Sequence, residues 1–109
     1  MTIALQVDDV IRALSDPTRR AVFEEIARSS EVSVSHLTRV SGVTQGAVSQ
    51  HLAKLKQAGL VASKADGRQV FYSVQPEGLK PLSDWLGHYQ GFWRERFDGL
   101  RDLLEGIEE

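Results

Sequence analysis

The residues best suited to chemistry in this chain are polar and basic side chains between Thr44 and Arg68. Two glutamines and one serine, Gln45, Ser49 and Gln50, lie within residues 44–50 at spacings that place them on one side of a helix. Glutamine can form a bidentate pair with adenine, and a serine hydroxyl both donates and accepts hydrogen bonds at base edges. Lys54, Lys64 and Arg68 follow them, and such cations bind phosphate oxygens. These residue types predict contacts with base edges and with a phosphate backbone.

The charge distribution supports the same interpretation. Residues 32–76 contain five basic residues and one acidic residue, a net charge of +4. Residues 1–31 contain four basic and six acidic residues (−2), and residues 77–109 contain four and eight (−4). The whole chain carries a formal charge of −2, so it is not a general polyanion binder. Its local positive charge favours a local contact with nucleic acid.

The elements that must position these residues follow from capping signals and from the spacing of apolar residues. Asp16 can cap a helix, and Pro17 suits its first position. Asp66-Gly67 lies between two β-prone runs, 60–64 and 69–74, which is a strong hairpin signal. Ser33 and Thr44 are further candidate caps. The expected helices span residues 3–14, 17–28, 33–40, 44–58 and 77–105.

The helical periodicity assigns faces to two of these helices. In the helix 17–28, we expect one set of residues inside (Ala21, Val22, Ile26 and Ala27) and another outside (Arg19, Arg20, Glu24 and Glu25). In the helix 44–58, three residues form the core face (Val48, Leu52 and Leu55) and five point the opposite way (Gly46, Gln50, Ala53, Lys54 and Gln57). The sequence therefore predicts a helix-turn-helix followed by a β-hairpin wing. The fold class is mainly α with a small β-hairpin.

The candidate DNA-binding residues lie on the second helix of this motif and on the wing. Gly46 lowers the stability of the helix by about 1 kcal/mol relative to alanine. Its benefit would be that the backbone, without a side chain there, can approach a DNA groove closely. Lys56 and Gln57 are either phosphate contacts or part of a solvated face, and His51 either reaches a phosphate or packs at the seam between helices. The predicted DNA-binding set is Thr44, Gln45, Gly46, Ser49, Gln50, His51, Lys54, Lys64 and Arg68.

The last predicted helix carries a wide aromatic and leucine stripe. A body of about 70 residues cannot cover it, so we expect pairing with the first helix and with a second copy of the chain. The DNA-reading part would be residues 33–74, and residues 3–14 and 77–105 would form the dimer interface of a single domain, 1–109. The predicted interface residues are Val7, Val10, Leu82, Trp85, Leu86, Tyr89, Trp93 and Phe97.

Several other classes of function are disfavoured. The chain has no cysteine, which excludes a thiol nucleophile, a disulfide framework and a thiolate metal site. Its three histidines fall on three different predicted helices without a nucleophile motif or phosphate loop, so we do not expect an enzyme. The first residues do not resemble a signal peptide, and no apolar run approaches the ~20 residues of a membrane span. A cytoplasmic location is therefore expected.

Four segments carry a resemblance to a known family. Residues 13–20 (ALSDPTRR) resemble an ALADPTR opening, residues 45–52 (QGAVSQHL) a recognition helix, residues 55–61 (LKQAGLV) an L-x-x-AGLV stretch, and residues 67–72 (GRQVFY) a wing. Together they resemble the ArsR/SmtB family of winged-helix transcriptional repressors along essentially the whole chain. The resemblance implies a dimer that binds double-stranded DNA at an inverted repeat.

The departures from that family concern metal binding. Many metal-sensing members carry ELCVCDL before the recognition helix, and here both cysteine positions are serine, Ser33 and Ser35. Serine hydroxyls are poor ligands for soft metals. Asp84 and His88 form only half of a C-terminal site of the kind other members use, so no metal or other cofactor is expected. The last helix resembles a metal-independent branch of the family.

The sequence thus predicts a homodimeric repressor that is autoregulatory, which means that it binds upstream of its own gene. Two alternatives remain. The aromatic stripe could hold a partner protein, which would make the chain a winged-helix adaptor, although an adaptor does not need the local +4 charge. The second alternative is a repressor that responds to a metal bound at the C-terminal helices. The inducer, if one exists, is unknown.

Overall fold

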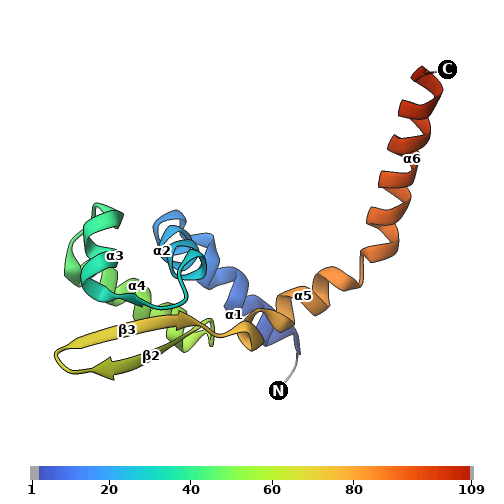
Figure 1. The fold of residues 1–109 in the computed structure, drawn as a ribbon. Helices are drawn as coiled ribbons and strands as arrows, with labels where there is room; N and C mark the ends of the chain where they lie inside the picture. The colour runs from blue at the N-terminus through green and yellow to red at the C-terminus, as the bar shows by residue number, and fades with distance from the viewer. Residues whose placement is uncertain (1–2, 109) are drawn as a thin grey trace.

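The computed structural model describes residues 3–108, and side chains within residues 6–106. Figure 1 shows a body made of the first helices and a small sheet, with the last helix extending away from it. No helix of the described part is long and apolar enough to cross a membrane. In chain order the elements are α1 (Ile3–Ser15), α2 (Pro17–Arg28), β1 (Val32–Ser33), α3 (Val34–Ser41), α4 (Gln45–Gln57), β2 (Val61–Asp66), β3 (Gln69–Val74), the 3-10 helix η1 (Pro76–Leu79), α5 (Lys80–Gly87) and α6 (Gln90–Glu108).

The predicted helix caps are confirmed. The Asp16 carboxylate accepts the N–H of Arg19 at 2.9 Å, with Pro17 in the first position of α2. The Ser33 and Thr44 hydroxyls each accept an N–H three residues on, both at 3.1 Å, at the starts of α3 and α4. Each cap satisfies one backbone donor that has no partner inside its helix. The helix starts are therefore encoded locally.

The sheet has three antiparallel strands in the order β1-β3-β2. The hairpin β2–β3 is the predicted wing, and its strands pair up to Asp66 and Gln69, which leaves Gly67-Arg68 as a two-residue turn. Gly67 has a φ of 64°, which the turn requires and which glycine adopts at little cost. The strand β1 was not predicted. It has two residues and exists only through its pairing with β3, where Val32 lies opposite Tyr72.

The core lies between α2, α3, α4 and the sheet. On α4 the predicted inner face is confirmed, since Val48, Leu52 and Leu55 are at most 1% exposed. On α2 the prediction is half right: Val22 and Ile26 are buried with Phe23, whereas the two alanines are exposed. The buried apolar cluster consists of Val10, Ala13, Val22, Phe23, Ile26, Val32, Leu37, Val48, Leu52, Leu55, Leu60 and Val61.

Arg19 was predicted on the outer face of α2, and this is wrong. Its side chain is 8% exposed and folds back along the end of α1. Its Nε donates to the Ala13 carbonyl, and a terminal nitrogen donates to the Arg12 carbonyl at 3.2 Å. These carbonyls lie in the last turn of α1, where a cation is stabilised at the negative end of the helix, and the Arg12 carbonyl also accepts the Ser15 hydroxyl at 2.7 Å. Arg19 thus joins α1 to α2.

The single helix predicted for residues 77–105 is also wrong, because the structure divides it into η1, α5 and α6. At the break, the N–H groups of His88 and Tyr89 donate to Trp85 and Leu86, three residues earlier, as in a tight turn. Gly87 and Gly91 flank this turn, and each glycine disfavours helix by about 1 kcal/mol relative to alanine. The first part packs on α1, whereas every described side chain of α6 is exposed.

Candidate nucleic-acid interface

The start and the outer face of α4 are open to solvent. Because Val48, Leu52 and Leu55 are held in the core, the opposite side of the helix must face outward. The exposed residues are Thr44, Gln45, Gly46, Ser49, Gln50, Ala53, Lys54, Lys56 and Gln57. The structure therefore brings the predicted polar residues of this helix together on one accessible surface. The Thr44 hydroxyl is also occupied as the helix cap.

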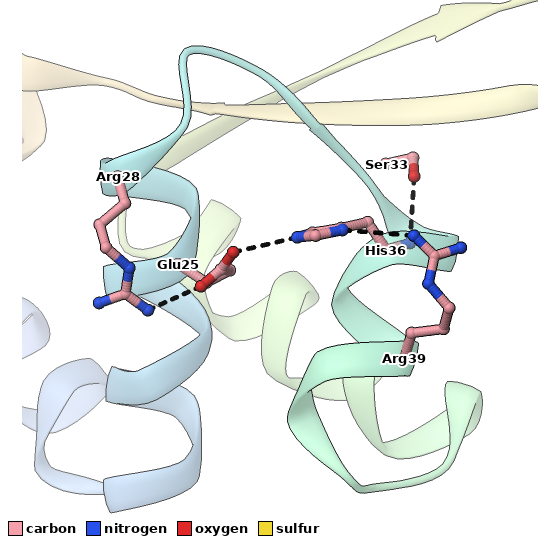
Figure 2. A network of polar contacts seen from close by, with 5 residues as sticks. All are labelled: Glu25, Arg28, Ser33, His36 and Arg39. Atoms are coloured by element: carbon pink, nitrogen blue, oxygen red, sulfur yellow. Dashed lines mark hydrogen bonds and ion pairs between the residues drawn. The ribbon is translucent and has the colours of Figure 1, made fainter.

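Packing against α2, α3 and β2 sets the orientation of α4. A polar network joins the first two of these supports (Figure 2). Glu25 on α2 contacts Arg28 at 2.7 Å through one carboxylate oxygen and His36 Nε2 on α3 at 3.0 Å through the other. The second ring nitrogen of His36 lies 3.4 Å from an Arg39 nitrogen. The network fixes α3 on α2 and so supports the helix-turn-helix.

The His36 and Arg28 hydrogen bonds lower the pKa of Glu25 below its usual value, with the His36 bond the larger cause. Glu25 was predicted on the outer face, but it is half-buried between the two helices. Sequence reasoning missed this network. A glutamate and a histidine eleven residues apart on separate helices leave no local pattern that would reveal the contact.

The wing presents the second group of predicted residues. Lys64 and Arg68 are exposed, and Arg68 lies in the two-residue turn at the tip. Lys56 is exposed as well, but its Nζ donates to the Ser63 hydroxyl at 2.8 Å and so links the end of α4 to β2. Lys56 therefore already has a side-chain partner within the chain.

His51 is half-buried and lies toward the start of α2. The pKa of Asp16 is lowered, mainly by the hydrogen bond from the Arg19 N–H, with the Arg19 and His51 side chains adding electrostatic contributions. Of the two roles considered for His51, its position favours the seam between α4 and α2. This residue is the only member of the predicted DNA-binding set within the described part that is not fully exposed.

The predicted dimer residues divide into two groups. Val7 and Val10, which were predicted to meet a partner, are only 5% and 2% exposed in a single chain, and their place in a dimer interface stays a prediction. Helix α1 packs on α2 and α5, and those contacts cover them. Leu82 is half-buried against the core. The remaining predicted residues, Trp85, Leu86, Tyr89, Trp93 and Phe97, are all exposed.

The apolar surface on α5, on α6 and on the turn between them is larger than the predicted set. It also includes Phe92, Leu100, Leu103 and Leu104, which are between 47% and 65% exposed. Trp85 packs edge-on against Tyr89, and Phe92 against Trp93, so the aromatic rings order one another locally. We call this set of nine exposed residues the apolar arm. A monomer leaves the apolar arm uncovered, although contiguous apolar patches of this kind are rare on monomers.

Comparison with known proteins identifies the fold and its class of function. A profile described as a helix-turn-helix domain matches residues 14–64. The HTH-type transcriptional regulator Rv2034 of Mycobacterium tuberculosis is 37% identical over 98 residues, 90% of this chain and 88% of that protein. A solved ArsR-like transcriptional regulator from Rhodococcus sp. RHA1 superposes with a TM-score of 0.72 at 28% identity, covering 92% of this chain and 93% of that one.

The chain belongs to the ArsR/SmtB family of transcriptional regulators. The HTH-type transcriptional regulator YgaV of Escherichia coli K12 is also similar, with 32% identity over 72% of this chain and 80% of that protein. The winged helix-turn-helix fold is thereby established, and so are DNA binding and transcription regulation as its class of function. Members of the family are not enzymes.

The positions where some ArsR/SmtB proteins bind metals have other partners in this chain. Ser33 caps α3, and Asp84 contacts Lys80 Nζ at 2.8 Å. Within the part of the chain that the structure describes, no three histidine, cysteine, aspartate or glutamate residues gather as a set of metal ligands. Neither serine nor the Asp84–Lys80 pair supplies the donors that a soft metal prefers.

Proposed function

We propose that this ArsR/SmtB protein is a homodimeric repressor that binds an inverted-repeat operator, including one upstream of its own gene, in the cytoplasm. The observation that carries the proposal is the single accessible surface on α4, which combines glutamines, serine and Lys54, together with the exposed cations Lys64 and Arg68 on the wing. Bound at a promoter, such a dimer would exclude polymerase. The proposed regulator belongs to a metal-independent branch.

In this proposal, the residues at the start of α4 read bases. The first residues of a recognition helix approach base edges in the major groove. Gln45, Ser49 and Gln50 are exposed there and carry the donors and acceptors that base edges require. Lys54, Lys64 and Arg68 would contact phosphates, which positions the protein without specifying sequence. Gly46 would admit close approach of the backbone to the groove.

The apolar arm supports the dimer. Its nine side chains are at least 40% exposed in one chain, and burial of a large apolar side chain is worth about 1.5–3 kcal/mol. A second copy offers the same surface in a two-fold arrangement, which would cover both arms. Two recognition helices related by a two-fold axis would enter successive major grooves, about 34 Å apart.

The test compares variants for DNA affinity over a range of salt concentrations and over several DNA sequences. Gln45→Ala and Ser49→Ala should relax base preference and reduce discrimination at one position of the half-site by about 1–3 kcal/mol. Lys64→Gln and Arg68→Gln should weaken binding to every sequence, and each should reduce the salt slope by about two units because it removes one phosphate contact from each protomer of the dimer. Lys80→Gln, which removes a cation outside this surface, is the control and should leave both properties unchanged.

The dimer is tested separately by sedimentation. Phe97→Asp, at a side chain that is 65% exposed in the monomer, should convert the dimer to a folded monomer and weaken operator binding. A wild-type chain that sediments as a monomer at micromolar concentration would contradict the dimer. In that case, the apolar arm would favour the alternative of an adaptor that binds another protein. Equal loss at all sequences for every α4 variant would contradict the division of roles.

A further inference from the structure

A groove lies on the side of the body where α1 and the end of α4 meet. Its volume is about 340 Å³, which is at the lower end of the range for small-molecule sites, about 300–1,000 Å³. Asp9, Arg12 and Ala13 line it from α1, and Arg19 lines it from α2. The other wall is formed by Lys54, Gln57 and Ala58. The groove therefore joins α1 to the helix that carries the candidate DNA surface.

The charges in this groove favour an anion. Three cations, Arg12, Arg19 and Lys54, face a single carboxylate, Asp9. The ion pair between Asp9 and Arg12 is weak: its atoms are 3.4 Å apart, and the two side chains are 61% and 74% exposed. Exposed ion pairs of this kind contribute little to stability. The Arg12 guanidinium can therefore turn toward a ligand at small cost.

Arg19 supplies the fixed part of the site. Two of its nitrogens are held by the Arg12 and Ala13 carbonyls, which orients the guanidinium while satisfying only part of its five donors. Its side chain is 8% exposed, and it forms no ion pair with a carboxylate of the described residues. The Asp16 carboxylate interacts electrostatically with Arg19 but forms no ion pair with it, so the hydrogen-bond partners of this buried cation are neutral carbonyls. Such a cation gains from an added anion, because the surroundings screen the interaction poorly.

The remaining lining determines the chemical class. Ala13 and Ala58 contribute apolar surface, and the Gln57 amide adds a donor and an acceptor. The groove is too roomy for a bare phosphate, and Asp9 would repel a doubly charged ion more than a singly charged one. We propose that this groove binds a small organic carboxylate, with its charge between Arg12, Arg19 and Lys54 and its apolar body against Ala13 and Ala58.

Lys54 gives the site a consequence for DNA binding. It lines the groove and is also one of the exposed cations on α4. A carboxylate bound to its ammonium group would neutralise a charge that a phosphate would otherwise use, so the two ligands would oppose each other. By linkage, each would weaken the other by the same factor. This second part rests on the proposed DNA-binding function, whereas the binding of a carboxylate does not.

The first experiment measures binding to the full chain without DNA. Benzoate is the probe, benzamide is its uncharged counterpart, and the amide signals of Ala13, Gln57 and Ala58 report occupancy by NMR. Benzoate should bind about ten-fold more tightly than benzamide, because benzamide cannot form the same charge-assisted hydrogen bonds. Arg12→Gln should weaken the binding of benzoate by about ten-fold, and Asp9→Asn should strengthen that binding by removing a charge of the same sign as the ligand. Lys80→Gln, at an exposed cation on α5 outside the groove and the DNA surface, is the matched control and should leave the benzoate affinity unchanged.

Each of three results would overturn the site: equal affinity for benzoate and benzamide, weaker benzoate binding in Asp9→Asn, or tighter binding of inorganic phosphate than of benzoate. The phosphate result would assign the groove to the DNA backbone instead. The Asp9→Asn arm matters most, because a general disturbance of α1 would weaken binding and could not strengthen it.

The second experiment adds DNA at constant ionic strength. Saturating benzoate should weaken operator binding of the wild type about three-fold or more, and Arg12→Gln should bind the operator as the wild type does but lose this response. Benzamide is the control for solvent effects. If benzoate occupies the groove and operator affinity stays the same, the coupling is refuted. If the wild type binds no specific DNA, the proposed function fails while the first experiment still decides the site.

Discussion

Replacing Gly78 by alanine should destabilise the junction between the DNA-reading part and the C-terminal helices. An added Cβ would lie 2.0 Å from the Gly59 carbonyl oxygen, 2.7 Å from its carbon and 3.0 Å from the Leu60 Cα. All three atoms are backbone, so none can rotate away. The same segments are already tied by the Gln75 N–H, which donates to the Leu60 carbonyl at 2.9 Å.

The size of the effect follows from this clash. Nonbonded atoms pack best at about 3.5–4 Å, so η1 must move away from the turn after α4 by about 1 Å or more. Overpacking of a closely packed site costs about 1–3 kcal/mol, and backbone on both sides places Gly78→Ala near the upper end. The melting temperature should then fall by about 12–24 °C, since 1 kcal/mol corresponds to roughly 4–8 °C in a domain of this size.

The assay is urea and thermal unfolding followed by circular dichroism, at one protein concentration because a dimer's stability depends on it. Gly87→Ala is the matched control. Its added Cβ meets nothing within 4 Å, and alanine favours helix, so it should be neutral or stabilising by up to about 1 kcal/mol. An unchanged unfolding midpoint for Gly78→Ala would refute the close packing of η1 on this turn. Equal losses in both variants would attribute the effect to glycine replacement in general.

Three further predictions concern α4, the start of α2 and the network of Figure 2. Gly46→Ala should raise the free energy of unfolding by about 1 kcal/mol, because alanine favours helix and the added Cβ meets only the Thr44 hydroxyl at 4.0 Å. The same substitution should weaken DNA binding. Tighter DNA binding would contradict the close approach of Gly46 to the groove. Asp16→Ala should cost about 1 kcal/mol in urea unfolding through loss of the helix cap, whereas Asp16→Asn should retain most of the stability. The His36 and Arg28 hydrogen bonds lower the pKa of Glu25 from 4.5, so the folded state binds the Glu25 proton less readily than the unfolded state does. The stabilisation by the Glu25 carboxylate is therefore present above pH 4.5 and is lost as the pH falls below that value. Glu25→Gln should flatten the acid side of the curve of stability against pH, and a slope equal to that of the wild type would contradict this role.

The parts of the fold that are encoded locally were predictable. Asp16, Ser33 and Thr44 identify helix starts because a cap and its partner lie three residues apart. The inner face of α4 and the hairpin with its Gly67 turn follow from spacing and turn chemistry in the same way. The candidate DNA surface could therefore be located within one helix and one turn.

The features that the sequence did not reveal depend on contacts between distant residues. The strand β1 exists only through β3, and Glu25 becomes half-buried only because His36 arrives from α3. Arg19 looked like an outer-face cation, but its side chain is buried and donates to the Arg12 and Ala13 carbonyls at the end of α1. Periodicity alone extended the last helix through residues 87–91, since the apolar spacing continues across a turn flanked by two glycines.

The most direct test of the central claim is selection of random duplex DNA by the purified chain at moderate salt, with the retained sequences read out. A dimer that reads DNA through α4 should enrich an inverted repeat whose half-sites are separated by about one helical turn, about 10 base pairs. Gln45→Ala should change the enriched bases within each half-site while the spacing stays the same. Retention of DNA without enrichment, or of none, would contradict a sequence-specific dimer that reads DNA through α4.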